Sequence, residues 1–221
     1  MKKDLELVKE KININNYSLR EIADFFEKFD GSIIEVKTLN HNIKIKISKY
    51  VLPHILGLQY AFGDRKDSKN FKGKLGFEKL KNGEISFFDL KRIIKNKPNI
   101  KIGWKMIENR IEYLPMFLNT LINKTRFKIV SADKIARNSK LKGEYVLFKV
   151  VNDTGKTVFP LMSLKIIKNP TCVIETFIVE EDISFIGALQ EERILKIELN
   201  LLINEKSFYI LLNNEKQILN V

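Results

Sequence analysis

The apolar residues of this 221-residue chain change their spacing near Thr125, and this change limits the folds that the chain can adopt. Before Thr125 they recur mostly every three or four residues, as on one face of an α-helix. After Thr125 they form short β-branched runs of the kind found in strands. The sequence therefore predicts an α+β fold, with helices and a β-hairpin first and a mainly antiparallel sheet second.

Local signals give the expected elements of the first half. Ser18 and Glu21 form a capping box before an apolar helical stripe, and Pro53 suits a first helical turn. The alternating runs 32–39 and 42–48 flank the turn Asn40-His41-Asn42 and predict a β-hairpin. Helices are expected at residues 4–14, 19–29, 54–62, 74–80, 87–95 and 104–122.

The second half is expected to form a sheet. Asn152-Asp153-Thr154-Gly155 is typical of a hairpin turn. We expect one domain over 1–221, with an N-terminal helical extension (1–31), a hairpin plus helical lobe (32–124) and an antiparallel sheet lobe (125–221). Strands are expected at residues 125–131, 144–151, 157–167, 171–179, 191–203 and 207–212.

The net charge of +12 is concentrated in the first half of the chain. Residues 1–110 carry 24 lysine or arginine residues against 14 acidic ones, a net charge of +10, whereas residues 111–221 carry +2. Such a field attracts polyanions such as nucleic acid. A lysine-rich solvated surface is the alternative. The basic residues do not form one amphipathic helix, so a membrane partner is not expected.

The residue inventory excludes several classes of site. Two histidines and the single Cys172 cannot build a standard zinc site, and there is no disulfide framework. No phosphate-binding glycine loop or nucleophile elbow is present. Carboxylates at Glu175, Glu180, Glu181 and Asp182 leave a Mg²⁺ site as an alternative. We expect a cytoplasmic protein without a cofactor or metal.

The order of several short strings resembles a family of phage nucleases named after barnase, EndoU, colicin and RelE, in particular its fourth group. The strings are HILGL at 54–58, LKNGEI at 80–85 and ETF at 175–177, with a basic hairpin before them and Arg110 on a helix between the last two. The resemblance covers roughly residues 32–198. It implies an RNase-like fold and a metal-free phosphodiesterase site between helices and a curved sheet.

Metal-free RNA cleavage needs a base for the 2′-hydroxyl, an acid for the 5′-oxygen and cations for the phosphorane. His54 is the candidate acid or base because the pKa of histidine lies near neutrality. Arg110 can bind phosphate in a bidentate manner. Glu175 and Thr176 are the polar side chains of an otherwise apolar strand, and Glu175 is a candidate acid, base or partner of Arg110. Each has a structural alternative: a packed histidine, a surface ion pair, or a strand-forming threonine.

Lysines near the His54 helix in sequence are expected to bind backbone phosphates of the substrate. His41 is expected in an exposed turn, and Tyr145 and Gln190 are weaker candidates for chemistry. The lysines are Lys72, Lys74, Lys79 and Lys81.

Two functions remain open from the sequence. The first is a metal-independent endoribonuclease of phage, mobile-element or toxin type, which cleaves RNA by 2′-hydroxyl attack and has a cognate inhibitor or antitoxin as a possible partner. The second is a non-catalytic nucleic-acid-binding or interaction module on the same fold.

Overall fold

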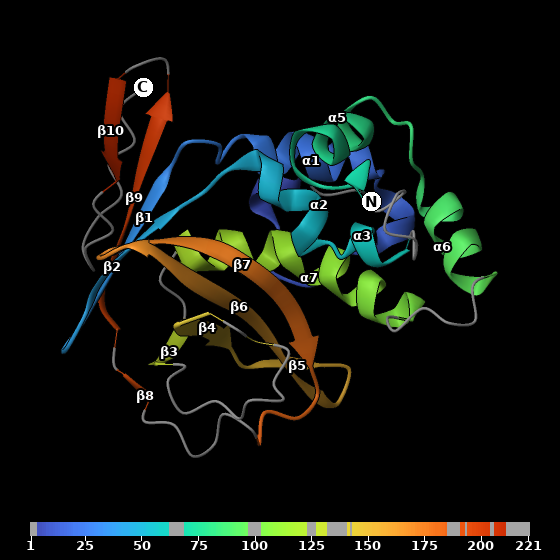
Figure 1. The fold of residues 1–221 in the computed structure, drawn as a ribbon. Coiled ribbons are helices and arrows are strands. Elements are labelled where there is room, and N and C mark those ends of the chain that lie inside the picture. Colours follow the sequence, from blue (N-terminus) through green and yellow to red (C-terminus); the bar gives the residue numbers. More distant parts are fainter. Residues whose placement is uncertain are drawn as a thin grey trace.

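The protein is an α+β molecule in which helices lie on one side of a large curved sheet, as predicted from the sequence (Figure 1). The computed structural model describes residues 4–61, 69–96, 103–122, 127–131, 141, 143–184, 191–192, 194–203 and 206–210. All structural statements below refer to these residues.

The helical elements follow the predicted order. Both N-terminal capping boxes form: Ser18 with Glu21, and Ser86 with Asp89. The long helix α7 continues through Pro115. The elements are the 3₁₀ turns η1 (Leu5–Leu7), η2 (Ile14–Asn16) and η3 (Lys49–Val51), and the helices α1 (Leu19–Glu27), α2 (Leu52–Ile55), α3 (Leu58–Ala61), α5 (Gly73–Lys81), α6 (Phe87–Lys95) and α7 (Trp104–Ile122).

The helix predicted at residues 4–14 is wrong, because the segment forms only the turns η1 and η2. Its backbone groups bond to α7 in place of helical partners. Asn119 donates to the carbonyls of Leu5 and Val8 at 2.6 and 2.9 Å. The Ile12 N–H donates to the Glu112 carbonyl at 3.0 Å. The apolar residues of this segment are buried, but they pack on α7 from an irregular segment and not from a helix.

The helix predicted at residues 54–62 is interrupted at Gly57. This glycine has a φ of 78°, a left-handed conformation that ends α2. The chain then turns and begins α3 at Leu58. Phe62 lies outside the described residues. The break matters because it places α2 and α3 in two directions around one polar site.

The strands pair into one sheet of ten strands within the described residues. The order is β10-β9-β1-β2-β7-β6-β4-β3-β8, and β5 pairs with β6. All pairs are antiparallel except β2 with β7. The strands are β1 (Ile33–Thr38), β2 (Asn42–Lys46), β3 (Phe127–Ser131), β4 (Tyr145–Lys149), β5 (Val151–Asp153), β6 (Lys156–Lys168), β7 (Thr171–Glu180), β8 (Glu191–Glu192), β9 (Ile194–Ile203) and β10 (Lys206–Ile210).

The early hairpin β1–β2 is part of this sheet, although we predicted it in one lobe with the helices. β1 pairs with β9, and β2 pairs in parallel with β7. The hairpin therefore lies between the late strands β9 and β7, both of which are far from it in the sequence. The division into three parts within one domain stays a prediction.

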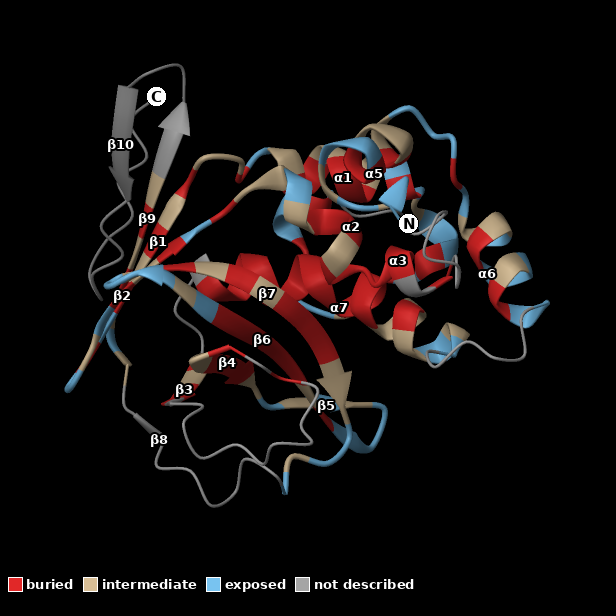
Figure 2. Cartoon of the chain, viewed as in Figure 1, coloured by how far each residue is buried: buried red, intermediate tan, exposed pale blue. Residues whose placement is uncertain are grey.

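Two apolar clusters hold the layers together. The larger lies between the helices and the sheet and contains Met162 and Phe177. The smaller contains Leu161 and Ile178, their neighbours along β6 and β7. Since neighbouring residues of a strand point to opposite faces, the sheet buries apolar side chains on both faces here. Figure 2 shows the buried residues concentrated along α7, β6 and β7.

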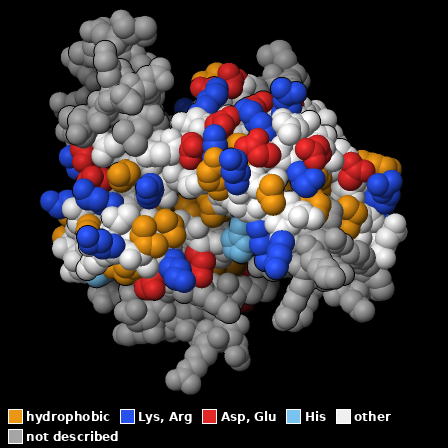
Figure 3. All heavy atoms as spheres, turned by 45° about the horizontal axis from the view of Figure 1, so that its top comes forward, with side chains coloured by type: hydrophobic (Ala, Val, Ile, Leu, Met, Phe, Trp, Pro, Cys, Tyr) orange, Lys and Arg blue, Asp and Glu red, His pale blue; other side chains and the backbone are white. Residues whose placement is uncertain are grey.

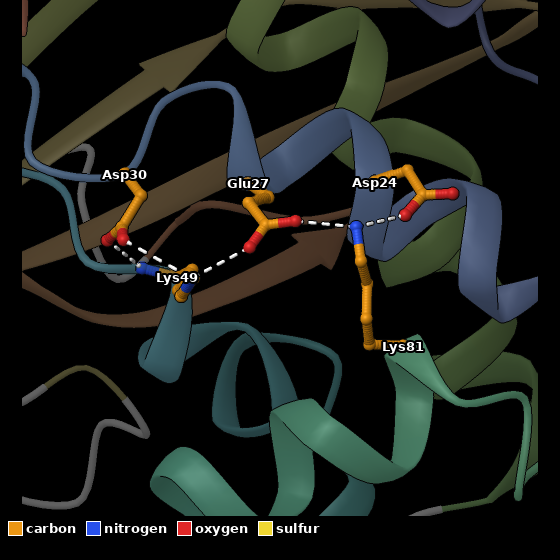
Figure 4. A network of polar contacts seen from close by, with 5 residues as sticks. All are labelled: Asp24, Glu27, Asp30, Lys49 and Lys81. Carbon is orange, nitrogen blue, oxygen red and sulfur yellow. Dashed lines mark hydrogen bonds and ion pairs between the residues drawn. The ribbon is translucent and has the colours of Figure 1, made fainter. Parts of the chain in front are cut away.

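Carboxylates of α1 and the turn after it tie down η3 and α5 through two lysines (Figure 4). Lys49 pairs with Glu27 at 2.7 Å and with Asp30 at 3.8 Å. Lys81 pairs with Glu27 at 2.5 Å and with Asp24. Glu27 thus bridges both lysines, and hydrogen bonds from Lys49 and Lys81 lower its pKa.

We expect Glu27→Gln to destabilise the protein at about pH 7 and much less at about pH 3. The folded-state pKa of Glu27 lies below its ordinary value. Its contribution is therefore complete above the unfolded-state pKa and is lost as the pH falls through the folded-state pKa. Urea unfolding at both pH values measures this difference, with the exposed Glu10→Gln as control. An equal cost at both pH values would contradict the bridging role.

Candidate active site

The site lies where the edge of β7 leaves β2 and meets α2. The β2–β7 pairing covers only Lys44–Lys46 with Thr171–Val173. Beyond Val173, α2 packs against β7 on the helical side of the sheet (Figure 1). Pro53 and His54 lie in the first turn of α2, which begins at Leu52. The packing of α2 on β7 therefore brings the imidazole to this strand edge.

A β-bulge marks the same point of β7. Ser163 pairs with Thr176 and the next residue, Leu164, pairs with Ile174, so Glu175 is the extra residue. A bulge bends the strand and frees a residue from the regular ladder, and it often re-aims a side chain beside a functional site. Glu175 is therefore set apart from its neighbours by backbone geometry as well as by charge.

His54 is half-buried and contacts two polar partners. Its Nδ1 lies 2.6 Å from the amide nitrogen of Gln59 on α3, and the ring also bonds to the backbone carbonyl of Glu175. Burial lowers the pKa of His54, and the positive charge of Arg110 lowers it further. The negative charge of Glu175 and the bond to its carbonyl raise the pKa of His54, whereas the positive charge of Lys72 lowers it. On balance these surroundings favour the uncharged form of the ring.

Arg110 and Thr176 complete the set of predicted site residues. Arg110 is buried on α7 and donates to the Ile55 carbonyl at 3.2 Å, which anchors its guanidinium under α2. Thr176 is buried on β7 beside the bulge. The structure therefore brings His54, Arg110 and Glu175 together from α2, α7 and β7, with Thr176 next in the strand. Their roles stay predictions.

Three further residues support this site and were missed in the sequence. The Gly143 N–H donates to the Ser163 hydroxyl at 2.9 Å, and that hydroxyl donates to the Glu175 carboxylate at 3.1 Å. A Cβ at Gly143 would lie 2.3 Å from the Leu164 carbonyl oxygen, so only glycine fits. Gln59 is buried against His54, and its carbonyl oxygen has no described partner. A polar residue inside an apolar helix was the one available signal for Gln59.

The predicted phosphate-binding lysines fall into two pairs. Lys72 and Lys74 are exposed at the start of α5, and the charge of Lys72 reaches His54. Lys79 pairs with Glu84 at 2.8 Å, and Lys81 pairs with Glu27. Figure 3 shows one face on which a histidine side chain lies at the surface close to lysine or arginine side chains.

The weaker candidates contact each other or lie outside the described residues. His41 is half-buried rather than exposed, because its ring contacts Tyr145 edge-on and its Nδ1 lies 3.3 Å from the Tyr145 hydroxyl. Gln190 lies outside the described residues. Among the described residues, no three His, Cys, Asp or Glu side chains gather into a group that could hold a metal ion.

A half-buried neutral imidazole beside a guanidinium and a carboxylate is typical of acid–base chemistry on phosphate esters. The chain matches the family described as phage-Barnase-EndoU-ColicinE5/D-RelE like nuclease4 over residues 18–198, and it belongs to this family of nuclease-like proteins. This confirms the resemblance seen in the sequence. No curated protein and no solved structure matches the chain significantly. None of the described helices is long and apolar enough to cross a membrane.

We expect Glu175→Gln and Arg110→Met to move the pKa of His54 in opposite directions. Removing the carboxylate takes away an anion that favours the imidazolium, so the pKa falls further. Removing the guanidinium takes away a cation that opposes it, so the pKa rises. Proton NMR titration in a His41→Asn background follows a single imidazole. Shifts of the same sign, or no shift, would show that these charges do not face His54.

Proposed function

We propose that the chain is a metal-independent endoribonuclease that cleaves RNA by attack of the 2′-hydroxyl on the adjacent phosphodiester. The observation that carries the proposal is the position of the half-buried His54 at the bulged edge of β7, where the charges of Arg110 and Glu175 act on its ring. A neutral imidazole can accept a proton at physiological pH, whereas an imidazolium cannot. Membership of a family of nuclease-like proteins supports a nucleic-acid substrate.

Each charged residue has a role in this reaction. Once the substrate displaces the Gln59 amide from Nδ1, His54 takes the proton from the 2′-hydroxyl as the hydroxyl oxygen attacks phosphorus. The P–O5′ bond then breaks to leave a 2′,3′-cyclic phosphate, and the departing 5′-oxygen takes up a proton from solvent. The Glu175 carboxylate then stabilises the imidazolium that forms, and it is itself held by Ser163. Arg110 supplies fixed positive charge for the phosphorane oxygens in a buried setting, where such charge acts strongly. Thr176 pairs with Ser163 and lies on the sheet face of Ile178, away from α2, so we assign it to holding the bulged strand and not to a contact with the phosphate.

The substrate backbone is expected to run along the start of α5. Lys72 and Lys74 are exposed there, and Lys72 is close enough to influence His54. Lys79 and Lys81 are held by carboxylates, so they contribute less to phosphate binding unless the substrate displaces those partners. We assign the protein to the cytoplasm, with RNA as partner and a cognate inhibitor or antitoxin as the expected regulator.

The second candidate is a non-catalytic nucleic-acid-binding module. One observation favours it: both ring contacts of His54 are made inside the chain, to Gln59 and to the Glu175 carbonyl. A histidine with a purely structural role would show the same contacts. The two candidates differ in whether His54 is needed for bond cleavage.

We expect His54→Ala to lower the rate of RNA cleavage by about 10²-fold or more, the usual range for a lost general base, and to leave RNA binding within about twofold. Incubation with tRNA and mRNA in EDTA, followed by end mapping, measures the rate and the product. His41→Ala is the matched control. A 2′,3′-cyclic phosphate end establishes the reaction type.

Wild-type activity without cyclic phosphate ends would contradict the proposed attack. Full activity of His54→Ala would remove His54 from the mechanism. Binding without cleavage of any RNA would favour the non-catalytic module.

We expect the double change Lys72→Ala and Lys74→Ala to weaken RNA binding and to reduce the salt dependence of the binding constant. Two lost phosphate contacts on single-stranded RNA lower the slope of log K against log salt by about 1.4. Fluorescence anisotropy at several salt concentrations measures this slope. Lys81→Ala should leave the slope unchanged because its charge is already paired with Asp24 and Glu27. Equal slopes for the wild type and the double variant would place the substrate elsewhere.

A further inference from the structure

An aromatic hollow of about 530 Å³ lies between the N-terminal segment and the helices α6 and α7. Four aromatic side chains line it: Tyr17, Phe87, Phe88 and Trp104. Phe88 is 72% exposed, which is unusual for a side chain of this size. Tyr17, Phe87 and Trp104 are half-buried and pack their inner edges on the main core. The hollow therefore has a firm apolar floor and one aromatic ring that projects into solvent.

The charges around this hollow favour an anionic ligand. Lys91 lies over the Trp104 ring at 5.8 Å, and Arg92 lies over the Phe88 ring at 5.9 Å. Arg20 also lines the hollow. The lining carboxylate, Glu108, is paired with Lys105 at 2.9 Å and accepts from the Trp104 indole N–H at 3.3 Å.

The hollow is connected to the candidate active site through α3. This helix contacts α2, which carries His54, and it also contacts α6, which carries Phe88 and Lys91 (Figure 1). α3 therefore links the two sites by direct packing, with its described side chains buried between them. Exposed aromatic faces flanked by cations are the usual platform for unpaired bases, because each base stacks on a ring while its phosphate meets a cation.

We propose that this hollow binds unpaired bases of single-stranded RNA by stacking on Phe88 and Trp104, with Lys91 and Arg20 on the phosphates. The choice of RNA rests on the proposed function, whereas the stacking rests on the hollow itself. The site holds the substrate at a distance from His54 and selects single-stranded over duplex RNA, whose bases are already stacked.

The fluorescence of Trp104 tests the proposal, because it is the single tryptophan of the chain. The probe is a single-stranded 2′-O-methyl oligonucleotide, which cannot react by 2′-hydroxyl attack. We expect the oligonucleotide to quench the Trp104 emission of the wild type and of His54→Ala in a saturable manner. Phe88→Ala should weaken binding about tenfold or more, the range for a lost stacking partner. Leu75→Ala, which truncates another exposed apolar side chain outside the hollow, is the matched control.

Three results would overturn the proposal. Unchanged emission would show that the hollow does not bind single-stranded RNA and would favour a protein partner. Equal quenching by inorganic polyphosphate would show that the hollow binds by charge alone and not by base stacking. Equal affinity of Phe88→Ala and the wild type would exclude the exposed ring. Quenching in a wild-type protein that cleaves no RNA would refute the proposed catalysis while this binding site stands. RNA cleavage without quenching would refute this binding site while the proposed catalysis stands.

Discussion

The site depends on how strand β7 is paired along its length. β2 covers one edge of β7 only as far as Val173, and the bulge at Glu175 follows directly. A fully paired strand would use its backbone groups in the ladder, whereas this edge offers a carbonyl to His54. The same bulge sets the Glu175 carboxylate beside the Ser163 hydroxyl. One irregularity of the sheet thus positions both the carbonyl that the imidazole contacts and the carboxylate whose charge acts on it.

Burial gives this arrangement its chemical character. A histidine in water is partly protonated near neutrality, but desolvation and the nearby Arg110 charge keep His54 neutral. Arg110 is itself buried and held by the Ile55 carbonyl, so its charge stays in place without a rearrangement. Fixed charge in a poorly solvated site stabilises a developing anion more than charge in water does. The long helix α7 and the short helix α2 therefore act together, one holding the cation and the other the base.

The sequence predicted the elements well where local signals are strong, as in the capping box of Ser18 and Glu21 and in the hairpin. It named His54, Arg110 and Glu175 as candidates, and the charges of Arg110 and Glu175 do act on His54, but the roles of these residues stay predictions. It missed Ser163 and Gly143, since their contacts depend on strand register and on the bulge, which no local pattern encodes. It gave residues 4–14 as a helix because apolar spacing does not reveal that Asn119 satisfies the backbone of that segment.

The proposed reaction requires that the His54 ring contacts the substrate and not only Gln59 and Glu175. The most direct measurement is the pKa of His54 in the wild type, with and without a bound 2′-deoxy oligonucleotide that cannot be cleaved. We predict a value below the ordinary 6.5 for the chain alone and a rise on binding, because a phosphate beside the ring favours the imidazolium. A pKa that the bound oligonucleotide leaves unchanged would contradict the account and make His54 a structural residue.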